Sequence, residues 1–191
     1  MNEGDVANIT DNLIAEGKTE PFVVVTMNNQ QYSQGPGNSG PNWNYTEIER
    51  DQIDYIMPYV ESRYNVSKEA KGRAYAGLSM GGSTTSNMLM QHPELFDYYG
   101  IWSYANTEGS YGGVEGITAQ TVRDRLSALS TKPHIMLAAG SWDFGQAPVK
   151  TFGENLTQLG FDYTYLQVPA AHDWECWQLI YANAVENFLW K

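Results

Sequence analysis

Segments typical of buried strands alternate with segments typical of helices along the chain, and this alternation limits the fold more than any other feature. Short apolar or β-branched runs are each followed by a longer stretch with apolar residues at helical spacing. Such alternation is typical of the α/β class, a mostly parallel sheet with helices on both faces. We predict strands at 22–27, 72–78, 98–103, 134–139 and 163–168, and helices at 6–16, 47–64, 80–91, 119–129, 148–159 and 177–190.

The size and composition of the chain fit one packed domain. Its 191 residues can bury a sizeable core, so we expect a single domain over 1–191. The apolar runs are much shorter than a membrane span, and we expect no membrane association. Eleven basic residues against 22 acidic ones give a formal net charge of −11, which disfavours nucleic acid as a partner. Three scattered histidines and one cysteine match no metal-binding motif, so we expect neither metal nor cofactor.

The clearest functional motif is a Gly-x-Ser-x-Gly sequence between a predicted strand and a predicted helix. Gly77, Ser79 and Gly81 form this motif, in the place that a nucleophile elbow occupies. We expect both glycines to be required, because a β-carbon at either position would collide across so tight a turn. The backbone N–H of Met80, at the start of the helix, is the expected oxyanion donor.

A serine nucleophile needs a histidine base and a carboxylate that orients it. His172 follows the last predicted strand, where the base of the order Ser, acid, His is found, whereas His92 and His134 lie at a helix end and a strand start. Asp143 follows the preceding strand and is the expected acid. Asp173 is too close in sequence to the base to face its imidazole, so we expect it to fix the loop.

Aromatic residues are frequent near the predicted strand ends. Two long loops, 28–45 and 104–117, contain several of them, and we interpret the first loop as a surface loop with a binding role. Flat rings at these places would stack on a phenolic acyl group or a sugar, although ordinary core packing explains any single ring equally well. The expected substrate contacts are Trp102, Tyr104, Tyr111, Trp142 and Trp174.

Three segments resemble one known family. Asp11–Lys18, Ala76–Gly82 and Ala171–Trp174 are similar to the esterase D-like family, carbohydrate esterase family 1, and most of all to feruloyl esterase domains attached to bacterial xylanases. The resemblance implies an α/β-hydrolase fold and a serine esterase without cofactor, acting on ferulate or acetate esters of xylan. It also implies the same nucleophile, acid and base, and a secreted protein, although the first residues do not resemble a signal peptide.

The chain also departs from that family. Members carry further strands before the position of Met1, including one between the strands that correspond to 22–27 and 72–78, and its following loop supplies a second oxyanion donor. We therefore expect an N-terminally truncated α/β-hydrolase domain, impaired in activity, whose open edges are covered by an oligomer or by strand exchange. An acetyl xylan esterase, an acyltransferase with the same triad, and a non-catalytic carbohydrate-binding protein remain alternatives.

Overall fold

The computed structural model describes residues 4–27, 45–105 and 117–191. The chain divides into two compact units. One consists of Met1–Pro21 and Glu69–Lys191, and the other of Phe22–Lys68.

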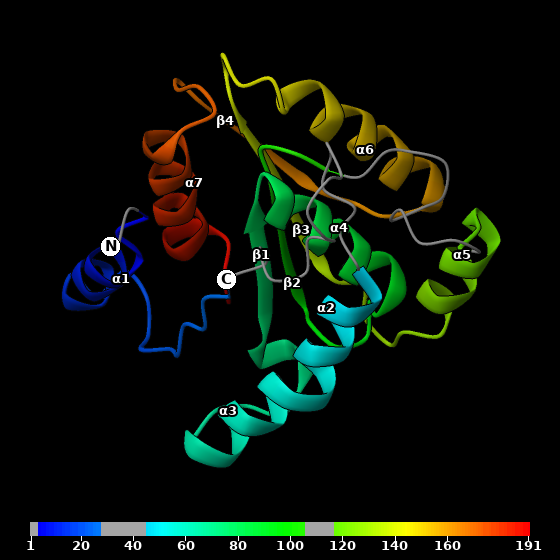
Figure 1. Cartoon of the computed structure of the whole chain (residues 1–191), viewed down its shortest axis with the longest axis horizontal. Coiled ribbons are helices and arrows are strands. Elements are labelled where there is room, and N and C mark those ends of the chain that lie inside the picture. The colour runs from blue at the N-terminus through cyan, green and yellow to red at the C-terminus, as the bar shows by residue number, and fades with distance from the viewer. Residues whose placement is uncertain (1–3, 28–44, 106–116) are drawn as a thin grey trace, which may run out of the picture. The chain divides into compact units, whose positions relative to one another are not determined.

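The first unit contains a four-stranded parallel sheet (Figure 1). Its strands are β1 (Ala74–Leu78), β2 (Tyr98–Trp102), β3 (His134–Gly140) and β4 (Thr164–Val168), in the order β1-β2-β3-β4. Because neighbouring strands are parallel, their carboxyl ends lie along one edge of the sheet: Leu78 is paired with Trp102, and Gly140 with Val168. Residues that follow different strands are thereby brought close together.

Helices cover both faces of this sheet (Figure 1). On one face lie α4 (Met80–Gln91), α5 (Ala119–Ser127) and α6 (Gln146–Leu159), and on the other lie α1 (Val6–Ala15) and α7 (Trp174–Asn187). The α7 face is a continuous apolar core, which explains why the helix and the sheet stay together. Its buried members are Trp102, Met136, Ala138, Val168, Ala170, Cys176, Ile180 and Ala184. The predicted parallel α/β architecture is confirmed.

The second unit contains three consecutive helical segments where a single helix, 47–64, is predicted. They are α2 (Tyr45–Asp51), the π-helix η2 (Gln52–Ile56) and α3 (Met57–Arg63). Pro58 lies in the first turn of α3, the part of a helix that tolerates proline best. The wider π turn ends at Ile56, two residues before this proline, so the helical path continues through a bulged turn rather than ending.

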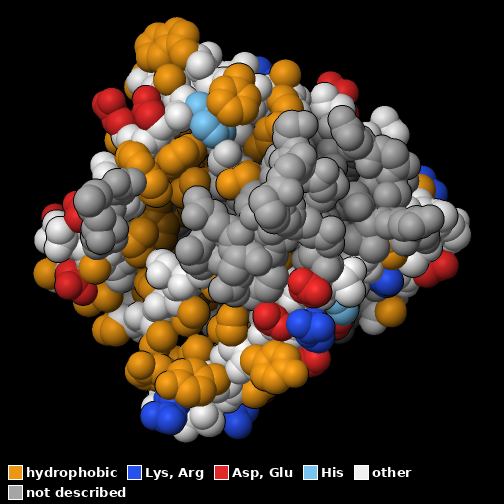
Figure 2. All heavy atoms as spheres, viewed as in Figure 1, with side chains coloured by type: hydrophobic (Ala, Val, Ile, Leu, Met, Phe, Trp, Pro, Cys, Tyr) orange, Lys and Arg blue, Asp and Glu red, His pale blue; other side chains and the backbone are white. Residues whose placement is uncertain are grey.

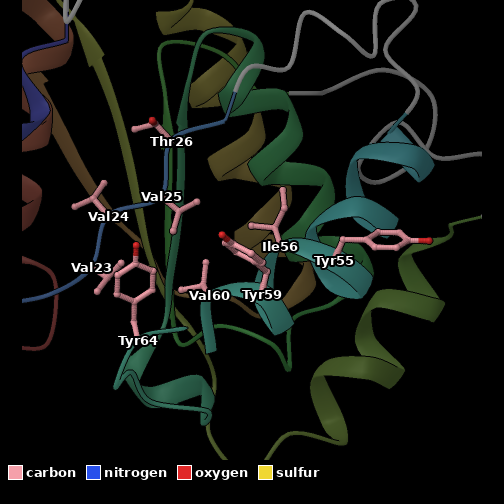
Figure 3. Close-up of a pocket in the computed structure, with 9 residues that line it drawn as sticks. All are labelled: Val23, Val24, Val25, Thr26, Tyr55, Ile56, Tyr59, Val60 and Tyr64. Atoms are coloured by element: carbon pink, nitrogen blue, oxygen red, sulfur yellow. The ribbon is translucent and has the colours of Figure 1, made fainter. Parts of the chain in front are cut away.

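The prediction of a buried strand at 22–27 is wrong. The segment forms no strand, and Val23, Val24 and Val25 are 41–49% exposed. An apolar run becomes a strand only where a neighbouring backbone pairs with it. Among the described residues, the paired strands are β1 to β4 alone. The apolar side chains of the segment instead line a groove of about 620 Å³ with residues of η2 and α3, including Tyr59, as Figure 3 shows.

Figure 2 shows hydrophobic side chains at the surface of the face in view, with charged side chains scattered among them. Large apolar residues that are exposed occur in both units, for example Tyr55 and Trp142. Within the described ranges, no helix combines the length and the apolar character needed to cross a bilayer.

Candidate active site

Ser79 lies at the turn between β1 and α4, in a backbone conformation that few residues adopt. Its φ and ψ angles are 53° and −118°, and its N–H donates to the carbonyl of Trp102 at 2.9 Å. A β-carbon on Gly77 would lie 2.2 Å from the carbonyl oxygen of Gly81, so glycine is required there. Such local strain is common at functional positions.

The requirement predicted for Gly81 is wrong, because a β-carbon at that position would meet no described atom within 4 Å. The second close approach belongs instead to Gly82, whose added β-carbon would lie 2.2 Å from the carbonyl oxygen of Tyr104. Helix α4 is thus packed tightly against the chain just after β2. This contact fixes the start of the helix relative to the sheet.

The structure brings Ser79, His172 and Asp143 into one hydrogen-bonded row. The Nε2 atom of His172 lies 2.9 Å from the Oγ of Ser79, and its Nδ1 atom lies 2.8 Å from the Oδ1 of Asp143. An ionised carboxylate only accepts hydrogen bonds, so Nδ1–H donates to Asp143 and Nε2 accepts from the serine hydroxyl. This is the tautomer in which the imidazole can take the serine proton.

Asp143 is the most enclosed of the three. Its side chain is fully buried, whereas that of His172 retains 16% exposure. Oδ1 of Asp143 also accepts the backbone N–H of Gly145 at 2.7 Å, while Oδ2 has no hydrogen-bond partner among the described residues. The carboxylate is therefore held by a hydrogen bond from its own loop, and the same oxygen lies within hydrogen-bonding distance of the imidazole.

Asp173, the carboxylate next to His172 in sequence, caps a helix and does not contact the imidazole in the way that Asp143 does. Its side chain caps α7 by accepting the N–H of Cys176 at 3.0 Å. This capping fixes the loop that carries His172, as the sequence predicts for Asp173.

Burial raises the pKa of Cys176 to about 11, so its thiol is protonated near neutral pH and is a poor nucleophile.

Met80 is the first residue of α4. The N–H groups of a first helical turn have no partner inside the helix, and the positive end of the helix dipole lies there. The Met80 N–H is thus in the position expected of an oxyanion donor.

No group of His, Cys, Asp and Glu that could hold a metal ion occurs in the part of the chain that the structure describes.

The aromatic residues predicted to contact substrate fall into three groups. Trp142, Trp174 and Tyr104 are 73%, 41% and 38% exposed, so their rings are accessible. The ring of Trp102 is only 6% exposed and packs in the core under α7, which makes it a core residue rather than a stacking surface. Tyr111 and most of the two aromatic loops lie outside the described residues.

Two aromatic neighbours of His172 were not identified from the sequence. The ring of Phe144 lies 4.0 Å from the imidazole, centroid to centroid, with a tilt of 32°. The ring of Trp177 lies 5.1 Å away at 86° and donates its Nε1–H to the Oγ of Ser103 at 2.9 Å. The only sequence signal is position, since Phe144 directly follows the acid and Trp177 is in the helix just after the base.

A strand-to-helix turn carrying serine, with an acid and a histidine after later parallel strands, defines the α/β-hydrolase class of enzymes. Within that class, the chain belongs to the esterase family described as "Putative esterase", whose model matches residues 1–186. The family resemblance predicted from the sequence is thereby confirmed.

Two curated proteins are similar to the chain. One is an endo-1,4-beta-xylanase/feruloyl esterase of Xylanibacter ruminicola, 36% identical over 101 residues, which cover 53% of this chain and 14% of that protein. The other is endo-1,4-beta-xylanase Y of Acetivibrio thermocellus. The two sequences are 26% identical in an alignment 196 residues long, which includes 91% of this chain and 17% of that protein. The chain thus matches only a small part of each relative.

Solved structures show the same fold. A mutant feruloyl esterase module from Clostridium thermocellum, complexed with sinapinate, superposes with a TM-score of 0.76 and 24% identity over 95% of this chain and 69% of that one. A CE1 ferulic acid esterase from Anaeromyces mucronatus gives a TM-score of 0.73 and 24% identity over 94% and 69%. The predicted α/β-hydrolase fold is thereby confirmed.

Proposed function

We propose that the chain is a serine esterase that hydrolyses feruloyl esters of plant cell-wall xylan. The observation that carries the proposal is the hydrogen-bonded row from Asp143 through His172 to Ser79. The names of the similar xylanases and feruloyl esterases support the substrate class. The exposed rings of Trp142 and Trp174, which lie within two positions of Asp143 and His172 in the sequence, also support it.

The reaction has two halves. In the first half, His172 takes the hydroxyl proton as the Oγ of Ser79 attacks the ester carbonyl, and the resulting oxyanion is stabilised by the N–H of Met80. The imidazolium then gives the proton to the leaving alcohol, and a feruloyl-serine ester remains. In the second half, His172 deprotonates a water molecule that attacks this ester. It then returns the proton to the Oγ of Ser79 as the bond to the acyl group breaks, so that ferulate leaves and the serine hydroxyl is regenerated.

The rate is expected to be low. Met80 is the one oxyanion donor that we propose among the described residues, and loss of a single donor costs about 10²–10³ in kcat. We propose that a second copy of the chain, as an oligomer or by strand exchange, covers β1, an edge strand of the described sheet.

The decisive experiment is intact-mass analysis after treatment with a fluorophosphonate, comparing the chain with its Ser79→Ala variant. We expect a single adduct that is lost in the variant, accompanied by release of ferulate from methyl ferulate and from feruloylated xylan. A folded chain that forms no adduct would contradict the proposal. Faster turnover of 4-nitrophenyl acetate than of methyl ferulate would be consistent with the same triad and would indicate acetyl rather than feruloyl esters as the substrates.

A further inference from the structure

Phe144 has an unusual position for a large apolar residue. Its side chain is 70% exposed, yet its ring lies over the imidazole of His172 at 4.0 Å with a tilt of only 32°. At this distance and tilt, the ring covers one face of the imidazole. It follows Asp143 directly in sequence, so it belongs to the same short loop as the acid.

The other ring beside His172 is held in a different way. Trp177 is fixed by its hydrogen bond to Ser103, whose side chain is buried, and by perpendicular packing against Trp174 at 5.0 Å. Phe144 has no second aromatic contact among the described residues, and most of its surface faces solvent. Its place is therefore not explained by core packing, and its removal is expected to cost little stability.

The hydrogen bonds of His172 leave a degree of freedom that Phe144 can restrict. Both bonds, to Asp143 and to Ser79, are made by ring nitrogens, whose N–H and lone pair point along the plane of the imidazole. Hydrogen bonds tolerate moderate departures from ideal angles. These two bonds alone therefore allow the imidazole ring to tilt about the line that joins its two nitrogens. A ring stacked on the face opposes this tilt.

We propose that Phe144 is a positioning residue for the base. It keeps the lone pair of Nε2 directed at the Oγ of Ser79 and keeps water from the covered face of His172. When His172 accepts the serine proton, the π face of Phe144 is also next to the positive charge that forms. The inference rests on the proposed function, since it assumes that His172 acts as the base for Ser79.

The test compares Phe144→Ala, Phe144→Leu and Phe144→Tyr with wild type. The measurements are kcat and KM for methyl ferulate and 4-nitrophenyl acetate, and the rate constant of fluorophosphonate labelling. We expect kcat and the labelling rate to fall roughly tenfold in the Ala and Leu variants, by the same factor for both esters, because a small misalignment of reacting groups is costly. We expect KM to change less than twofold and the Tyr variant, which keeps a flat ring, to recover the wild-type rate.

The control variant is Tyr55→Ala, which removes another exposed aromatic ring, 64% accessible and in the second unit. It should keep the wild-type labelling rate, and the melting temperatures of the Phe144 variants should match that of wild type.

Three results would overturn the inference: an unchanged rate in Phe144→Ala, full activity in Phe144→Leu, or a loss confined to KM for methyl ferulate, which would make Phe144 a substrate contact. Failure of the proposed function looks different, because then wild type itself would form no adduct at Ser79. Labelling at Ser79 that is equally fast without the Phe144 ring would refute the positioning role alone.

Discussion

Replacing Gly77 with alanine is expected to disable the active site, whereas the same change at Gly81 is expected to leave it working. The added β-carbon at Gly77 would lie 2.2 Å from the carbonyl oxygen of Gly81 and 2.7 Å from its Cα. These are backbone atoms, which cannot rotate away, so the turn that carries Ser79 must shift by roughly 1 Å. A displacement of that size costs on the order of 10²-fold in rate.

At Gly81 the same substitution has a different outcome. No described atom lies within 4 Å of the added β-carbon, and the residue is the second of α4. Alanine is a better helix former than glycine by about 0.5–1 kcal/mol. The Gly81→Ala variant should therefore be at least as stable as wild type, with the position of Ser79 unchanged.

The assay is the second-order rate constant of fluorophosphonate labelling, with the melting temperature measured on the same samples. Gly77→Ala should label about 10²-fold more slowly. Overpacking of about 1–3 kcal/mol should lower its melting temperature by roughly 2–12 °C. Gly81→Ala should label within about threefold of wild type. If Gly77→Ala labels at the wild-type rate, or if the two variants are equally impaired, the argument from the crowded turn is wrong.

Three further predictions concern the acid loop and the buried thiol. Asp143→Asn should lower kcat for methyl ferulate by about 10²–10⁴, because the amide lacks the charge that stabilises the imidazolium of His172, and a loss below tenfold would contradict this role. Gly145→Ala should lower kcat at least about 10²-fold, since its β-carbon would lie 1.5 Å from the carbonyl oxygen of Ser103 and would displace the N–H that holds the acid; kinetics equal to wild type would contradict this. Cys176 ionises near pH 9.0 when unfolded but, because burial raises its pKa, near pH 11 when folded, so its contribution to the free energy of unfolding is present below pH 9 and is lost as pH rises toward 11. Urea unfolding between pH 8 and 11 should show a shallower decline for Cys176→Ala than for wild type, and equal slopes would contradict the assignment.

Features that depend on neighbouring residues could be predicted from the sequence. The Gly-x-Ser-x-Gly motif and the helical pattern after it are local, and α4 indeed covers Met80–Gln91, the residues predicted. The order of the acid and the base after later strands follows from the parallel topology. For this reason Asp143 and His172 could be selected among several carboxylates and histidines before their distances were known.

Features that depend on distant partners could not be predicted. The run Phe22–Met27 is apolar enough for a buried strand. The local sequence, however, does not show whether a neighbouring strand is available to pair with it. Gly81 ends the Gly-x-Ser-x-Gly motif and Gly82 follows it, but only the position of Tyr104 shows that Gly82 is the crowded one. The contact of Phe144 with His172 joins two loops 28 positions apart and likewise has no local signal.

The end of β2 connects the parts of the site, although it contributes none of the three triad residues. The carbonyl of Trp102 accepts the N–H of Ser79, and the N–H of Ser103 donates to the carbonyl of Ala138 in β3, the strand that leads to the acid. The carbonyl oxygen of Ser103 lies where a β-carbon on Gly145 would be, and its hydroxyl accepts from Trp177. Ser103 also has a positive φ of 59° and is fully buried. Since Ser79 follows β1, and Asp143 and His172 follow β3 and β4, the spacing between these side chains depends on the strand in the middle. The positive φ angles of Ser79 and Ser103 both occur beside this strand end, where backbone hydrogen bonds to Trp102 and Ala138 hold the strained residues in place.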